Sequence, residues 1–162
     1  MPFAQAAPAP GGIERVSVSS SGAERNFLPT GSTTSCTPLE SGKCAKRTVS
    51  DDGSKVVFTS RAPNLVPGDT NGVADIFVWT RGAAGSPGTV KRITNGNGDS
   101  EGPSISPNGQ WVSFESKATN LPGGEANGPI TDVFVADVQG NIVLASKPSK
   151  SGQAHSAGNS FG

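Results

Sequence analysis

The chain of 162 residues is poor in the residues that build a large core or a charged binding surface. Hydrophobic residues, with Gly left out, make up only 33%, against roughly 45% or more in an average globular domain when Gly is counted among them. Thirteen Lys and Arg balance thirteen Asp and Glu, and neither sign forms a block. No apolar run approaches the roughly 18 residues that a membrane-spanning helix needs. We therefore expect no nucleic-acid partner and no membrane span.

Residues that carry catalytic chemistry are equally scarce. His155 is the sole histidine, and it lies in a loop-like stretch near the end of the sequence. No Gly-x-Ser-x-Gly nucleophile elbow occurs. A Ser-His-Asp site is not expected from this inventory. We predict that the chain is not an enzyme.

The two cysteines, Cys36 and Cys44, lie in one polar run. Their spacing differs from that of a CxxC redox or metal pair, and neither a second pair nor a nearby histidine completes a zinc site. We predict a loop-closing disulfide, which would stabilise the fold by about 2–3 kcal/mol by restricting the unfolded chain. Two free thiols in a cytosolic protein are the alternative.

What the sequence does have is Gly (22), Pro (13) and short runs of Val, Ile and Phe. Apolar residues do not recur at i, i+3, i+4 and i+7 over any helix-length window, so no amphipathic helix is predicted. Gly and Pro stay below the roughly 25–30% that marks a disordered chain. This pattern predicts an all-β fold with long loops.

An internal repeat defines the organisation of that fold. Residues 49–60 and 105–116 share a strand end, a turn closing on Asp-Gly or Asn-Gly, and a strand ending in x-Phe-x-Ser. Such turns need the positive φ that Gly tolerates, so both segments are predicted hairpins. Residues 63–78 and 119–135 then match as Asn-Leu loops that run into Asp-(Ile/Val)-Phe-Val strands. Outer strands are predicted where a third pattern recurs, at residues 14–18, 91–94 and 141–144.

These motifs resemble the TolB-like, WD40-like (PD40-type) β-propeller repeat family in its bacterial secreted version, over about residues 46–146. The resemblance implies four-stranded antiparallel blades, a periplasmic or extracellular setting, and protein or ligand binding without catalysis. Propellers close with roughly 4–8 blades. The expected fold is therefore an incomplete propeller of about two blades plus one extra strand.

The predicted organisation follows from this reading. Residues 1–12 form a disordered Ala/Pro leader, and residues 13–48 hold a lone outer strand and the cysteine-containing insertion. Blades are predicted at residues 46–94 and 95–146, and residues 147–162 form a Gly/Ser-rich tail leading toward a further blade. The expected partners are a protein, further propeller blades or copies of the same chain.

Two binding features stand out in the loops and strands. Asp69, Asn71 and Asp75 alternate around a turn-making Gly, as in calcium loops, but supply few of the 6–8 oxygens that Ca²⁺ takes. The alternative is a structural role in Asx turns and strand-mouth hydrogen bonds. No other cofactor is indicated. Trp111 precedes a Val-x-Phe alternation and should face opposite Val112, either as a surface contact for a partner or buried between blades.

Four phenylalanines fall at matching places in the two repeats and are predicted to be core. They are Phe58, Phe77, Phe114 and Phe134. Neither tryptophan belongs to this shared core pattern. The leading functional hypothesis is a non-enzymatic binding scaffold. The alternatives are the non-catalytic propeller part of a larger peptidase-like hydrolase, or a structural protein that pairs blades between chains.

Overall fold

The computed structural model describes residues 47–123 and 130–146, and the regular structure in these ranges is entirely β. The all-β prediction is therefore confirmed for this part of the chain. The strands are β1 (Lys55–Ser60), β2 (Asp75–Thr80), β3 (Thr89–Arg92), β4 (Ser100–Ile105), β5 (Trp111–Ser116), β6 (Asp132–Asp137) and β7 (Ile142–Leu144).

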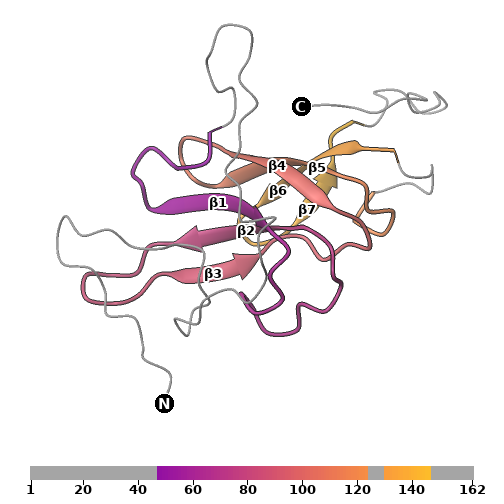
Figure 1. Cartoon of the computed structure of the whole chain (residues 1–162). Helices are drawn as coiled ribbons and strands as arrows, with labels where there is room; N and C mark the ends of the chain where they lie inside the picture. Colours follow the sequence, from indigo (N-terminus) through magenta and orange to yellow (C-terminus); the bar gives the residue numbers. More distant parts are fainter. Residues whose placement is uncertain (1–46, 124–129, 147–162) are drawn as a thin grey trace, which may run out of the picture.

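The strands form two antiparallel sheets, which Figure 1 shows side by side. The first sheet has the order β1-β2-β3 and the second has the order β4-β5-β6-β7. Within each sheet, every strand pairs antiparallel with the strand that follows it in the sequence. Neither sheet closes on itself.

The prediction of four strands in each unit is met by the second sheet and not by the first, which has three in the part described. The segment before β1 makes only an isolated bridge between Val49 and Val56. Its hydrogen bonds are divided between the sheets: the Thr48 carbonyl accepts from Val57 N at 2.9 Å, and the Arg47 carbonyl accepts from Ile105 N at 2.7 Å. The described part of this segment therefore adds a single bridge and no strand to the first sheet.

The two predicted hairpin turns have the same internal hydrogen bonds. Ser50 Oγ donates to Asp52 Oδ1 at 2.7 Å, and Ser106 Oγ donates to Asn108 Oδ1 at the same distance. Gly109 closes the second turn with φ of 68°, a conformation that L side chains rarely adopt. The repeat read from the sequence therefore extends to the geometry of the turns.

The predicted phenylalanine core is confirmed. Phe58 stacks on Phe77 with ring centroids 5.7 Å apart, and Phe114 stacks on Phe134 at 5.6 Å. All four side chains are at most 2% exposed. We call the side of each sheet that carries such a pair its phenylalanine face, and the other side its opposite face.

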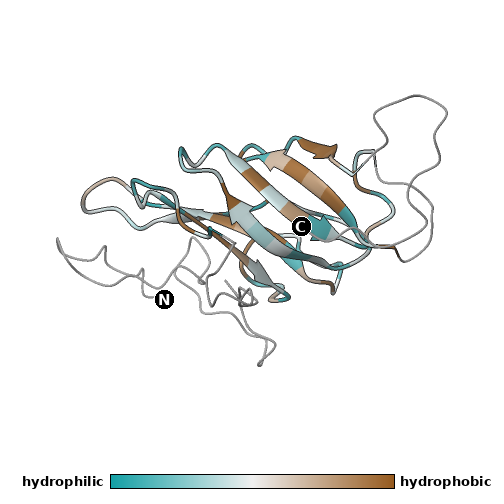
Figure 2. Cartoon of the chain, turned by 90° about the horizontal axis from the view of Figure 1, so that it is seen from above, coloured by the Kyte–Doolittle hydropathy of each residue, from teal (hydrophilic) through white to brown (hydrophobic). Residues whose placement is uncertain are grey.

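The sheets stack front to back, with the phenylalanine face of the second sheet on the opposite face of the first. The central contact joins Phe114 and Phe134 to Val57, Ile76 and Val78 in one buried cluster. Because successive strand residues point to opposite sides, the same strands of the first sheet direct their own phenylalanines away from this joint. Figure 2 shows the resulting alternation of apolar and polar positions along the strands.

Trp79 is part of the core, although the two repeats do not share a tryptophan at its position. Its side chain is 5% exposed and packs with Phe58 and Phe77 on the phenylalanine face of the first sheet. It reaches this face because it lies two residues after Phe77 on the same strand. The equivalent position in β6 is Ala136, so the two units fill one core site with side chains of very different size.

Candidate functional site

The opposite face of the second sheet is the candidate binding surface. The two most exposed large hydrophobic side chains in the described ranges lie on it: Val143 is 56% exposed and Trp111 is 51% exposed. We define this exposed face by its central and rim residues, Trp111, Ser113, Glu115, Val133, Val135 and Val143. Apolar side chains at such positions are the usual anchors of protein contacts.

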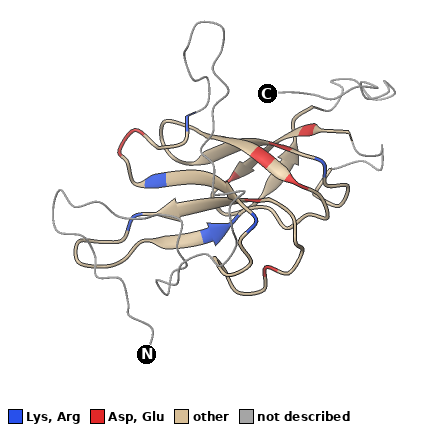
Figure 3. Ribbon diagram, viewed as in Figure 1, with Lys and Arg blue, Asp and Glu red and all other residues tan. Residues whose placement is uncertain are grey.

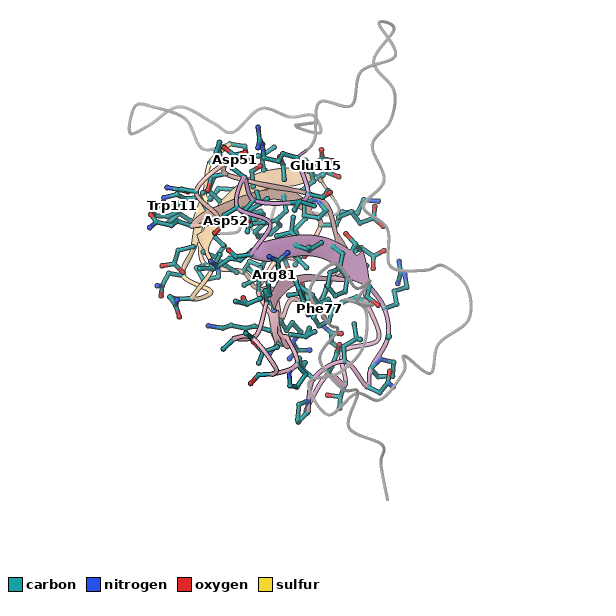
Figure 4. The ribbon with its side chains drawn as sticks, turned by 90° about the vertical axis from the view of Figure 1, so that its left-hand side faces the viewer. Asp51, Asp52, Phe77, Arg81, Trp111 and Glu115 are labelled. Atoms are coloured by element: carbon teal, nitrogen blue, oxygen red, sulfur yellow. The ribbon has the colours of Figure 1, made fainter. Side chains whose placement is uncertain are left out.

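Trp111 lies where the strand pattern predicts, facing opposite Val112, which is fully buried. Of the two placements that the sequence left open, the structure shows the surface one. The preceding turn fixes the residue, because Trp111 N donates to Ser106 Oγ at 3.0 Å. Figure 4 shows the indole on the outside of the molecule, whereas Phe77 lies within it.

The exposed face carries negative charge. Glu101 lies opposite Glu115 in the β4–β5 register, and Trp111 lies opposite Asp137 in the β5–β6 register. Strands β4, β5, β6 and β7 contain no Lys or Arg, whereas β1 and β3 of the first sheet do, a contrast visible in Figure 3. A partner for this face should therefore carry neutral or basic side chains at its rim.

Asp137 keeps its negative charge through the turn that follows β6. The Asn141 side-chain amide donates to it at 2.6 Å, and backbone N–H groups of Asn141 and Gln139 donate to its other oxygen. These hydrogen bonds hold the pKa of Asp137 below its ordinary value. The rim of the exposed face is therefore anionic at neutral pH.

The three calcium candidates come together, but around a cation of the protein itself. Arg92 Nη1 lies 2.8 Å from Asp69 Oδ1 and 3.6 Å from Asp75 Oδ2. Asn71 presents its Nδ2 donor, not its oxygen, to Asp75 at 2.9 Å, while its Oδ1 accepts from Val73 N at 3.3 Å in an Asx turn. Among the described residues, no group of three or more His, Cys, Asp or Glu is placed to hold a metal ion.

Asp75 organises the mouth of strand β2. Its Oδ1 accepts a hydrogen bond from the Thr94 hydroxyl at 2.7 Å, and Thr94 Oγ1 in turn accepts from Ile76 N at 3.0 Å. Burial raises the pKa of Asp75, and the hydrogen bonds from Thr94 and Asn71 act against that effect. These contacts match the structural alternative for the Asp69 to Asp75 loop.

The second unit repeats this arrangement. Ser146 Oγ donates to Asp132 Oδ1 at 3.0 Å and accepts from Val133 N at 3.3 Å. A hydroxyl that bridges the strand-mouth carboxylate and the next backbone N–H is therefore part of the repeat. Arg92 has no such counterpart, because the register places Leu144 in the equivalent position.

Sequence patterns do not predict Arg92 as a site residue, nor the ion pair that joins the two units. Asp99 Oδ2 lies 2.5 Å from Arg61 Nη2, and Asp99 Oδ1 accepts from Ala74 N at 2.9 Å. Partial burial acts to raise the pKa of Asp99, but the hydrogen bonds from Ala74 and Arg61 and the positive charges of Arg61 and Lys117 lower it overall. The hydrophobic repeat in the sequence predicts strands, but it does not predict contacts between loops of different units.

Cys36, Cys44 and His155 lie outside the described residues, so the disulfide stays a prediction. Within residues 47–123 and 130–146 there is no helix of a length and apolarity suited to crossing a bilayer. Comparison with family models, curated proteins and solved structures gives no match to this chain.

Proposed function

We propose that the chain is a non-enzymatic segment of a TolB-like, WD40-like β-propeller that serves as a protein- or ligand-binding scaffold in the periplasm or outside the cell. The supporting observation is the front-to-back stacking of two sheets that share their turns and phenylalanine pairs. Propeller blades are four-stranded antiparallel sheets arranged around a central channel. The second sheet has this strand number, and the stacking mode admits further units.

The carboxylates of the loops are bound by other groups of the protein itself, which also supports a scaffold. The carboxylates of Asp69 and Asp75 are occupied by Arg92 and Thr94, and Asp99 joins the two units. These groups hold loops and strand mouths in place. Within the described residues, the surface best suited to a partner is the exposed face of the second sheet, with Trp111 at its edge.

The test combines an activity screen with the solution mass of the purified, oxidised chain. We expect no turnover of fluorogenic peptide and ester substrates, and a mass that does not change between calcium and EDTA. Reproducible turnover that co-purifies with the chain and disappears on heat unfolding would contradict the proposal. A mass that depends on calcium would assign Asp69, Asn71 and Asp75 to a metal site instead.

A self-assembling structural protein is the second candidate, favoured by the exposure of Trp111 and Val143 on one face. Two units in each chain would close a ring of six or eight blades from three or four chains. Light scattering after size exclusion distinguishes the two cases. A discrete assembly of three or four chains would favour self-assembly, and a monomer would favour the segment of a longer propeller.

A further inference from the structure

Equivalent positions on the opposite faces of the two sheets differ in burial. Val57, Ile76 and Val78 are at most 2% exposed in the first sheet. Their counterparts in the second sheet are Ser113, Val133 and Val135, which all remain partly exposed. The same strand positions are thus core in one unit and surface in the other.

The first sheet shows what chemistry such a face accepts. Its Val57, Ile76 and Val78 are covered by the stacked pair of Phe114 and Phe134 from the next unit. Two of the three counterparts on the second sheet are again β-branched and apolar. A pair of aromatic rings from a further sheet would therefore find a similar surface there.

We propose that the exposed face of the second sheet is the docking surface for a further unit of this same repeat, which packs its stacked phenylalanine pair on Val133 and Val135. The inference rests on the proposed propeller-type scaffold and names the partner of its open face. It extends an interface that the molecule already contains between its own two units.

Trp111 has a defined role in this docking. Its counterpart in the first sheet, Lys55, lies under the second unit's turn: a Cβ added at Gly109 would lie 3.4 Å from Lys55 Cδ and 3.2 Å from Ser50 Cβ. A further unit placed in the same way sets its turn glycine over the Trp111 indole. An indole offers a broader apolar platform than the stem of a lysine, and Trp is enriched among the residues that dominate interface energies.

A positive charge is also present where a further unit would dock. Asp99 of the second unit pairs with Arg61 of the first, and the counterpart of Arg61 in the second unit is Lys117, which is exposed. A docking unit therefore finds a cation where its own Asp99-type carboxylate arrives. One contact is not repeated: Asp51 N donates to the Pro107 carbonyl at 2.9 Å, but Pro107 itself occupies the Asp51 position and has no N–H.

The experiment adds one unit to the chain. Residues 1–144 are followed directly by a second copy of residues 93–146, so that the junction reproduces the step from Arg92 to Ile93. The added copy carries Trp111→Phe, so the extended chain has only two tryptophans. They are the original Trp111 and Trp79, which is buried. Acrylamide quenching of fluorescence then reports the exposure of the original Trp111.

We expect the quenching of Trp111 in the extended chain to fall to the level seen for Trp79 alone in a Trp111→Phe variant of the natural chain. Val135→Lys in the first copy should restore the quenching and leave the unextended chain folded, because Val135 is partly exposed there. Val49→Lys, at a valine that is 43% exposed in the segment before β1, serves as the matched control and should leave Trp111 protected.

An added unit that stays unfolded by circular dichroism, or that folds and leaves Trp111 open to acrylamide, overturns the proposal. Protection of Trp111 in the unextended chain that grows with its concentration also overturns it, because a second copy of the chain would then occupy the face. The activity screen and the mass of the natural chain do not enter this test, so its failure is separate from failure of the proposed function.

Discussion

The two repeat units share their turns and phenylalanine pairs but fill one outer-strand position in opposite ways. Arg92 lies opposite Phe77 in the register of the first sheet and binds Asp69, whereas Leu144 lies opposite Phe134 and is buried in the core between the sheets. The shared features are those that every stacked sheet needs. The position that differs faces a charged loop in one unit and the apolar joint in the other.

The largest effect should come from the phenylalanine pairs. Phe114→Ala should lower the free energy of unfolding by about 3–5 kcal/mol, because it leaves a cavity between two sheets. Phe58→Ala should cost less, about 3 kcal/mol, since Phe58 packs against the loop residues Ala62 and Leu65, which can relax into the space. Urea unfolding measures both, and a larger loss for Phe58→Ala would contradict the assignment of Phe114 to the central joint.

Arg92→Leu gives the first unit the residue of the second and should destabilise it by about 3 kcal/mol at neutral pH, because two buried carboxylates lose their cation. The pKa of Asp75 is already raised by burial, so its protonation should relieve the variant as the pH falls. Urea unfolding at several pH values measures this. A cost that does not change with pH would show that packing, not charge, is the role of Arg92.

Substitutions of the two turn glycines should differ in their stability cost by a smaller amount. Gly109→Ala should cost about 1–2 kcal/mol, since φ is 68° and the added Cβ meets the Ser50 Cβ at 3.2 Å. Gly53 has a similar φ of 63°, but a Cβ added there meets only the flexible end of Arg81. Gly53→Ala should therefore cost only about 1 kcal/mol. Equal thermal midpoints for the two variants would contradict a close contact between the turns.

The loop that joins the units should respond to pH. The folded-state pKa of Asp99 is lowered, so its ionised form adds stability above its ordinary pKa, and this contribution is lost as the pH falls through the lower folded value. Asp99→Asn should cost about 1 kcal/mol at neutral pH, given that the pair is about one third exposed, and little in acid. Urea unfolding across this range tests it, with Arg61→Gln as the partner in a double-mutant cycle.

The smallest effect should be that of calcium. Excess CaCl₂ and EDTA should give the same thermal midpoint, because the Arg92 guanidinium already lies between the carboxylates of Asp69 and Asp75, where a calcium ion would have to bind. A calcium-dependent increase in stability, lost in Asp69→Asn, would show that the loop rearranges around the ion. The same titration on Arg92→Leu sharpens the comparison, since that variant lacks the competing cation.

Much of the fold was predictable because short-range patterns determine it. Period-two alternation and the Asp-Gly and Asn-Gly turns place the hairpins, and the matched phenylalanines fall in the core as predicted. The strand number of the first sheet was not predictable. The local sequence around Val49 suits a strand, but its backbone divides its hydrogen bonds between two sheets, and this depends on how the sheets stack.

The candidate site shows the same division. Position and alternation in the sequence place Trp111 opposite Val112, and the loop motif brings Asp69, Asn71 and Asp75 into one turn region. Only the tertiary structure decides that Arg92 fills the centre of that cluster, that Trp79 is buried and that Trp111 is exposed. The physical reason is that alternation tells which side of a strand a residue faces, whereas the stacking of sheets decides whether that side meets another sheet or water.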